Sequence, residues 1–147
     1  MSDIAVIITS HGYFAKEALA SVEMITGYKQ ENCAVVSISE GKDYADCLAE
    51  IKVAYASLDT SAGTLILCDI YGGTPANIST YLAIENSNII IYSGFNLPIL
   101  LEILLTKSNM NLTEISEKIE KIHKFSLTNI TEKLKGSIQD GNQMDSY

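Results

Sequence analysis

The fold of this chain is decided by the stretch IAVIITSHG, which occupies residues 4–12. Five consecutive apolar residues, most of them β-branched, are typical of a strand that is covered on both faces in a parallel α/β sheet. The polar residues that follow mark the carboxyl end of the strand, the edge at which open α/β sheets bind their ligands. The stretch therefore predicts a buried strand that delivers His11 to a ligand-binding edge.

A second apolar run, LILC at residues 65–68, ends in the same way, with Asp69 and the turn 70–75 behind it. If the two strands are neighbours, a histidine and a carboxylate meet in one crevice. The carboxylate can then fix the tautomer of the imidazole ring and leave its other nitrogen free as a nucleophile. His11 could instead be a helix cap or a structural residue, but the matching aspartate makes that interpretation the weaker one.

The rest of the chain alternates strand and helix patterns. Apolar spacing predicts further strands at 33–38 and 88–94, and helices at about 13–28, 43–58, 75–84, 97–105 and 112–124. These units predict a single-domain α/β fold with an open, mainly parallel sheet of order 2-1-3-4 and helices on both faces. A fifth strand is predicted at 125–131. The domain is expected to cover 1–135, with a short polar tail at 136–147.

Composition narrows the classes of function. A net charge of −8 on 147 residues argues against nucleic acid or an anionic membrane as the partner. The cysteines, Cys33, Cys47 and Cys68, are odd in number and lack C-x-x-C spacing, which favours buried thiols in a reducing compartment. No apolar stretch has the length of a membrane span, and no basic region precedes the first apolar run. We therefore expect a soluble, cytoplasmic protein without membrane insertion.

The surroundings of His11 are predicted to suit a phosphoryl group. A helix that begins after Gly12 would offer free amides and the positive end of its dipole. A pair of glycines after Asp69 allows close approach of the backbone, although a Gly-Gly-Thr-Pro segment is also an ordinary turn into a helix. The predicted phosphate contacts are Ser10, Gly12, Gly72, Gly73 and Thr74.

Other sites are disfavoured by the sequence. The dinucleotide fingerprint G-x-G-x-x-G, the phosphate loop G-x-x-x-x-G-K-[ST] and the hydrolase elbow G-x-S-x-G do not occur. His123, the only other histidine, is expected at the surface, so neither a metal site nor a cofactor is predicted. A receiver domain phosphorylated on Asp69 would need an acidic cluster at the position of Thr9, Ser10 and His11.

Four ordered motifs resemble the IIA component of the mannose-family sugar phosphotransferase system, over roughly residues 3–130. They are IITSHG at 7–12, SVEMITG at 21–27, LCDIYGGTPAN at 67–77 and SGFNLP at 93–98. The resemblance implies that His11 carries phosphate, with Asp69 as its partner. It also implies that the phosphocarrier protein HPr donates the phosphate and that a IIB subunit receives it for sugar uptake through the membrane components IIC and IID.

The resemblance further implies a homodimer in which a C-terminal strand, here 125–131, crosses to the partner's sheet. Some family members continue through an Ala/Pro-rich hinge into a IIB domain. Because this chain reaches Tyr147 without such a hinge, we expect a stand-alone IIA protein. The sugar stays open between mannose, fructose, sorbose and amino sugars, since a IIA component contacts only protein partners and a phosphoryl group.

Aromatic residues are predicted near the mouth of the crevice. Tyr13, Tyr71 and Phe95 are candidates for an apolar surface that docks two successive partners, whereas the helical spacing of Phe14 favours the core. Two other functions remain open at this stage. The chain could be a regulatory module that binds a transcription factor or kinase, or a binding protein that performs no chemistry.

Overall fold

The computed structural model describes residues 3–140. Its four strands are β1 (Ala5–His11), β2 (Cys33–Ile38), β3 (Thr64–Cys68) and β4 (Ile89–Ser93). All pair in parallel, in the order β2-β1-β3-β4, which confirms the predicted sheet. β1 and β3 are neighbours, and Thr9 pairs with Cys68 close to their carboxyl ends.

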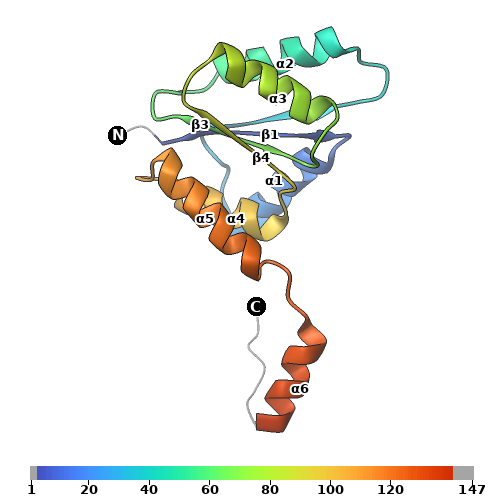
Figure 1. Ribbon diagram of the computed structural model, residues 1–147, viewed down its shortest axis with the longest axis vertical. Helices are drawn as coiled ribbons and strands as arrows, with labels where there is room; N and C mark the ends of the chain where they lie inside the picture. Colours follow the sequence, from blue (N-terminus) through green and yellow to red (C-terminus); the bar gives the residue numbers. More distant parts are fainter. Residues whose placement is uncertain (1–2, 141–147) are drawn as a thin grey trace.

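Helices cover both faces of the sheet (Figure 1). They are α1 (Phe14–Thr26), α2 (Tyr44–Ala56), α3 (Thr74–Glu85), α4 (Leu97–Thr106), α5 (Leu112–Phe125) and α6 (Ile130–Asp140). α2 and α3 lie on one face, and α1, α4 and α5 lie on the other. The layers confirm the predicted single-domain α/β fold.

The side chains of β1 alternate between these two layers. Ile4, Val6 and Ile8 pack in the layer of α1, α4 and α5, whereas Ile7 packs in the layer of α2 and α3. Because successive side chains of a strand point to opposite faces, Ser10 continues the first row and His11 the second. The imidazole of His11 therefore emerges on the α3 side of the sheet.

Local signals explain where several helices begin. The Asp43 carboxylate accepts a hydrogen bond from the amide of Asp46 at the start of α2, at 2.8 Å. At the start of α5, Asn111 and Glu114 form a capping box, each side chain accepting from the other residue's amide. Such caps satisfy amides that have no carbonyl partner within the helix.

The predicted strand at 125–131 is wrong. α5 continues to Phe125 and α6 begins at Ile130, so the segment joins two helices. The side-chain oxygen of Asn129 accepts from the amide of Glu132 at 3.0 Å, which supports the first turn of α6. α6 then runs through Gly136 to Asp140, into the predicted polar tail, and residues 141–147 of that tail lie outside the described residues.

α6 lies apart from the sheet and its covering helices (Figure 1). Ile130, Leu134 and Ile138 follow one another at helical spacing, and all three side chains are exposed. Within residues 3–140, none of the helices has the length and apolar character that crossing a membrane requires.

Candidate functional site

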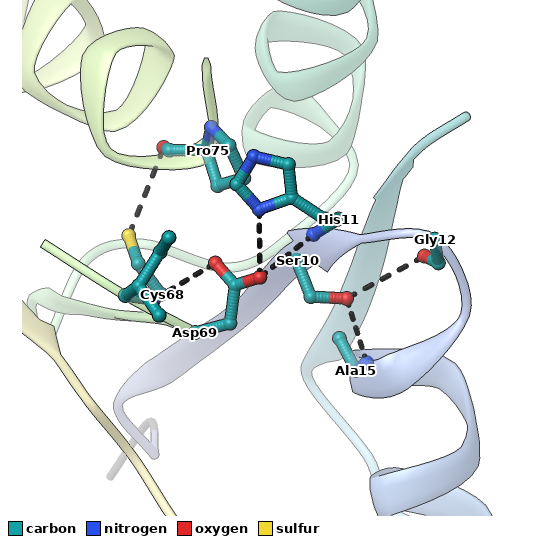
Figure 2. A network of polar contacts seen from close by, with 8 residues as sticks. Ser10, His11, Gly12, Ala15, Cys68, Asp69 and Pro75 are labelled. Carbon is teal, nitrogen blue, oxygen red and sulfur yellow. Dashed lines mark hydrogen bonds and ion pairs between the residues drawn. The ribbon is translucent and has the colours of Figure 1, made fainter. Parts of the chain in front are cut away.

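The crevice between the ends of β1 and β3 brings His11 and Asp69 together, as the sequence predicts (Figure 2). One carboxylate oxygen, Oδ2 of Asp69, lies 2.8 Å from Nδ1 of His11 and also accepts the backbone amide of His11 at 2.9 Å. The other oxygen, Oδ1, accepts the amide of Ile70 at 2.9 Å. Both oxygens of the carboxylate are therefore held by groups at the two strand ends.

These hydrogen bonds set the ionisation of Asp69. Its side chain is only 14% exposed, and burial alone would raise the pKa of the carboxyl. The backbone and ring hydrogen bonds from His11, together with the amide of Ile70, outweigh burial and hold the pKa below its ordinary value. An ionised carboxylate only accepts hydrogen bonds, so Nδ1 of His11 carries the proton. In the neutral ring, Nε2 then holds the free lone pair.

Nε2 is available for chemistry. The His11 side chain is 51% exposed, and among residues 3–140 none forms a hydrogen bond with Nε2. The ring lies against Gly73: a Cβ at that position would stand 3.2 Å from Nε2 and 3.1 Å from Cε1. The backbone at Gly73 has φ +84°, a conformation that side chains other than glycine's rarely adopt. Glycine thus leaves open the space beside the nucleophilic nitrogen.

The start of α3 faces this open space. α3 begins at Thr74 with Gly73 as its N-cap residue, and no side chain caps its first amides. Amides at the beginning of a helix lack carbonyl partners within it and carry the positive end of the dipole. Thr74 is half-buried at the same point, and Gly72 also has φ +84°. This arrangement suits an anion next to Nε2.

Two other predicted phosphate contacts are occupied by the fold. The buried hydroxyl of Ser10 accepts the amide of Ala15 at 2.7 Å, and the amide of Gly12 donates to the carbonyl of Ile38 at 2.8 Å. Ser10 points towards the α1 layer, on the opposite face from the ring of His11. Both groups therefore already have hydrogen-bond partners within the fold.

The aromatic residues around the site divide differently from the prediction. Tyr71, 92% exposed, and Tyr13 stand out at the surface as predicted. Phe95 is only 6% exposed, so its prediction as a docking residue is wrong; it packs in the core with its ring centroid 5.3 Å from that of Phe14. Phe14 itself is half exposed, so its assignment to the core is also wrong. Ile70, whose exposed side chain follows Asp69 directly, was not predicted as part of this surface.

The remaining predicted features do not belong to the pair of His11 and Asp69. His123 is exposed in the last turn of α5, as predicted. Cys33, Cys47 and Cys68 are free thiols, and the last two are buried. In the part of the chain that the structure describes, no three His, Cys, Asp or Glu side chains gather in a way that could hold a metal ion.

The sequence of this chain is similar to those of known phosphotransferase system components. The mannose-specific EIIAB component of Escherichia coli (strain K12) is 30% identical over 106 residues, which are 72% of this chain and 32% of that protein. This chain thus spans about a third of the length of that relative. The sorbose-specific EIIA component of Lacticaseibacillus casei is 29% identical over 129 residues, covering 88% of this chain and 92% of that protein.

Solved structures share the fold. The phosphotransferase system component EIIA from Streptococcus agalactiae superposes with a TM-score of 0.79 at 26% identity, covering 88% of this chain and 98% of that one. A family model described as the fructose IIA component of the phosphotransferase system (PTS) matches residues 5–120, which include the whole His11–Asp69 crevice. This chain therefore belongs to the mannose/fructose family of PTS IIA components.

Proposed function

We propose that this chain is a phosphocarrier of a sugar PTS, which accepts a phosphoryl group from phospho-HPr on Nε2 of His11 and passes it to a IIB subunit. The observation that carries the proposal is the pairing of Nδ1 with the Asp69 carboxylate at 2.8 Å, which leaves Nε2 unprotonated and exposed. An exposed nitrogen at a protein surface is within reach of a protein partner, and family membership supplies the partners.

The transfer is a substitution at phosphorus. The Nε2 lone pair of His11 forms a new N–P bond to the phosphoryl group. At the same time the N–P bond in the donor breaks, and the electron pair of that bond returns to the ring of the donor. Nδ1 keeps its proton throughout, so the Asp69 carboxylate stabilises the positive charge that develops on the imidazole. Delivery to the IIB subunit repeats the step in reverse, with a nucleophile of the acceptor attacking phosphorus.

The first turn of α3 is our proposed phosphate site. Its uncapped amides and the hydroxyl of Thr74 offset the charge of the phosphoryl group, and Gly72 and Gly73 let the backbone come close to it. Asp69 repels the same charge. Because the attraction and the repulsion oppose each other, the phosphoryl group is not held too tightly to be passed on.

Both partners are proposed to dock on the exposed apolar rim of the crevice. Tyr13, Phe14, Ile70 and Tyr71 are all more than half exposed and lie within three residues of His11 or Asp69 in the chain. Aromatic side chains supply large contact areas at protein interfaces. We propose that transfer occurs in the cytoplasm, at the inner side of a IIC/IID membrane complex.

We also propose a homodimer, assembled through α6 instead of the predicted strand. A free helix of 11 residues is marginally stable in water, so α6 needs a surface for its exposed Ile130, Leu134 and Ile138. We propose that a second copy supplies one at the β4 end of the sheet, where the isoleucine side chains of β4 are only partly buried. The relatives named above are a mannose-specific and a sorbose-specific component, so the sugar of this chain stays open.

The experiment is phosphoryl transfer from phosphoenolpyruvate through enzyme I and HPr, followed by intact mass. We expect an acid-labile gain of one phosphate in the wild type and none in His11→Ala, with His123→Ala as the matched control that keeps the gain. Transfer onward is read by adding a IIB subunit and following loss of the label. A folded wild-type chain that gains no phosphate from a competent HPr would rule out this function and favour a regulatory or binding role.

A further inference from the structure

The residues that precede His11 and Asp69 in the chain, Ser10 and Cys68, are both fully buried and both hydrogen-bonded. The hydroxyl of Ser10 accepts the amide of Ala15, in the first turn of α1, at 2.7 Å. The Cys68 sulfur lies 3.7 Å from the carbonyl oxygen of Pro75, in the first turn of α3. Each residue thus connects the end of its strand to the beginning of the helix that follows (Figure 2).

The two connections reach opposite faces of the sheet. Ser10 points into the α1 layer, and Cys68 packs in the α2 and α3 layer with Ile66. On the α3 side the connection has a second member, because the hydroxyl of Ser79 lies 3.4 Å from the Cys68 sulfur and donates to the Pro75 carbonyl at 2.7 Å. Buried hydrogen bonds therefore hold the turn after each strand against the helix that follows it.

The Ser10 hydroxyl and the Cys68 thiol are both suited to fix the position of a turn through a hydrogen bond. Burial raises the pKa of the Cys68 thiol, so the sulfur keeps its proton and can donate at neutral pH. Alanine at position 10 would leave the buried amide of Ala15 without a hydrogen-bond partner. Because an unpaired buried amide is unfavourable, we expect the first turn of α1 to shift. Movement at either turn shifts His11 relative to Asp69, because the turns begin at those residues.

We propose that Ser10 and Cys68 are positioning residues for phosphoryl transfer. They hold the two strand ends so that one Asp69 oxygen meets both the amide and the ring of His11. The inference rests on the proposed function for its kinetic consequence, but the orientation of the ring is a property of the unphosphorylated protein.

The test compares Ser10→Ala and Cys68→Ala with two matched controls. Thr64→Val removes a buried hydroxyl of β3 that has no hydrogen-bond partner among the described residues, and Cys47→Ala removes a buried thiol of α2. We expect the rate of phosphorylation by phospho-HPr to fall about tenfold in the two test variants, since displacement by about 1 Å can cost ~10²-fold. Both controls should stay within about twofold of wild type.

Two readouts separate positioning from a general loss of stability. The ¹⁵N resonances of the His11 ring should report a single Nδ1–H tautomer in wild type and controls, and a tautomer mixture in the test variants. Cys68→Ser, which keeps a donor, should recover the rate that Cys68→Ala loses. A test variant that fails to fold is replaced by Ser79→Ala or by Ser10→Cys, which weaken the same connections.

The outcomes are distinct. If the test variants match the controls in both rate and ring resonances, Ser10 and Cys68 do not position His11. If wild type is never phosphorylated, the proposed function fails, and the ring resonances alone decide the positioning role. A loss of thermal stability without a tautomer change would also overturn the inference.

Discussion

The two edges of the sheet each carry a basic side chain that bridges neighbouring segments, in opposite environments. At the carboxyl edge, His11 is half exposed and meets an ionised carboxylate. At the amino edge, Lys107 is 4% exposed, and its ammonium donates to the carbonyls of Glu31 at 2.7 Å and Ile4 at 3.4 Å. The same parallel topology thus builds two different polar junctions.

The two junctions differ in whether a polar atom remains without a hydrogen-bond partner from the protein. At the amino edge the cation is surrounded by backbone oxygens before β1 and β2, and burial lowers the pKa of Lys107. At the carboxyl edge the carboxylate engages one ring nitrogen and leaves the other in solvent. The buried ammonium of Lys107 can only contribute to the stability of the fold, because its hydrogen bonds go to the backbone. A chemical reaction needs an accessible lone pair, such as that on Nε2 of His11.

Removing the acceptor at the carboxyl edge should have the largest effect. In Asp69→Asn only one side-chain atom can accept, so the variant loses either the pair of bonds from His11 or the bond from Ile70. We expect phosphorylation by phospho-HPr to slow by about 10²-fold. Asp43→Asn is the control, because asparagine caps a helix as well as aspartate does. A loss below threefold would contradict the role of the carboxylate.

At the amino edge the expected effect is on stability alone. Lys107→Met leaves the carbonyls of Ile4 and Glu31 without their donor, which should lower the free energy of unfolding by about 1–3 kcal/mol. Urea denaturation measures the change, and the exposed Lys52→Met serves as the control. The folded variant should be phosphorylated at the wild-type rate. A slower rate at unchanged stability would show that the two edges are not separate in function.

The space beside Nε2 can be tested with two neighbouring glycines. Gly72 and Gly73 both have φ +84°, so alanine strains the backbone at either position, by about 1–3 kcal/mol at Gly73, where ψ is 177°. Only at Gly73 does the new Cβ meet the ring of His11, at 3.1–3.2 Å, while nothing lies within 4 Å at Gly72. Gly73→Ala should therefore slow phosphorylation severalfold more than Gly72→Ala, by a ratio of roughly five. Equal rates would show that the space next to the ring is not used.

The sheet and the central pair of residues were predictable from the sequence. Two buried runs end in polar residues, and in the predicted doubly wound order 2-1-3-4 their strands are neighbours, so His11 and Asp69 were expected to meet. The face on which each side chain lies was harder to foresee. Ser10 and His11 are adjacent in the chain, but the alternation of the strand sends them to opposite layers and makes only one of them part of the site.

The errors arose where tertiary contacts or competing local signals decide. Phe95 follows β4 in a turn whose packing beneath Phe14 cannot be seen in a local pattern. Residues 125–128 alternate apolar and polar side chains with the period of a strand, and the alternation breaks at Asn129. Helix α5 extends into the first of them, and the Asn129 cap starts α6 at the next residue. Period-two alternation over four residues was too short to outweigh a helix start.

The contacts of Asp69 also limit how far the His11 ring can move. A single oxygen of Asp69 binds both the backbone amide and the ring of His11, so the ring is tied to its own main chain. A phosphoryl group on Nε2 would then have a fixed location relative to the sheet instead of travelling on a swinging arm. Under the proposed function, a donor and an acceptor would each have to bring their own reactive atom to that location, and would occupy it one after the other.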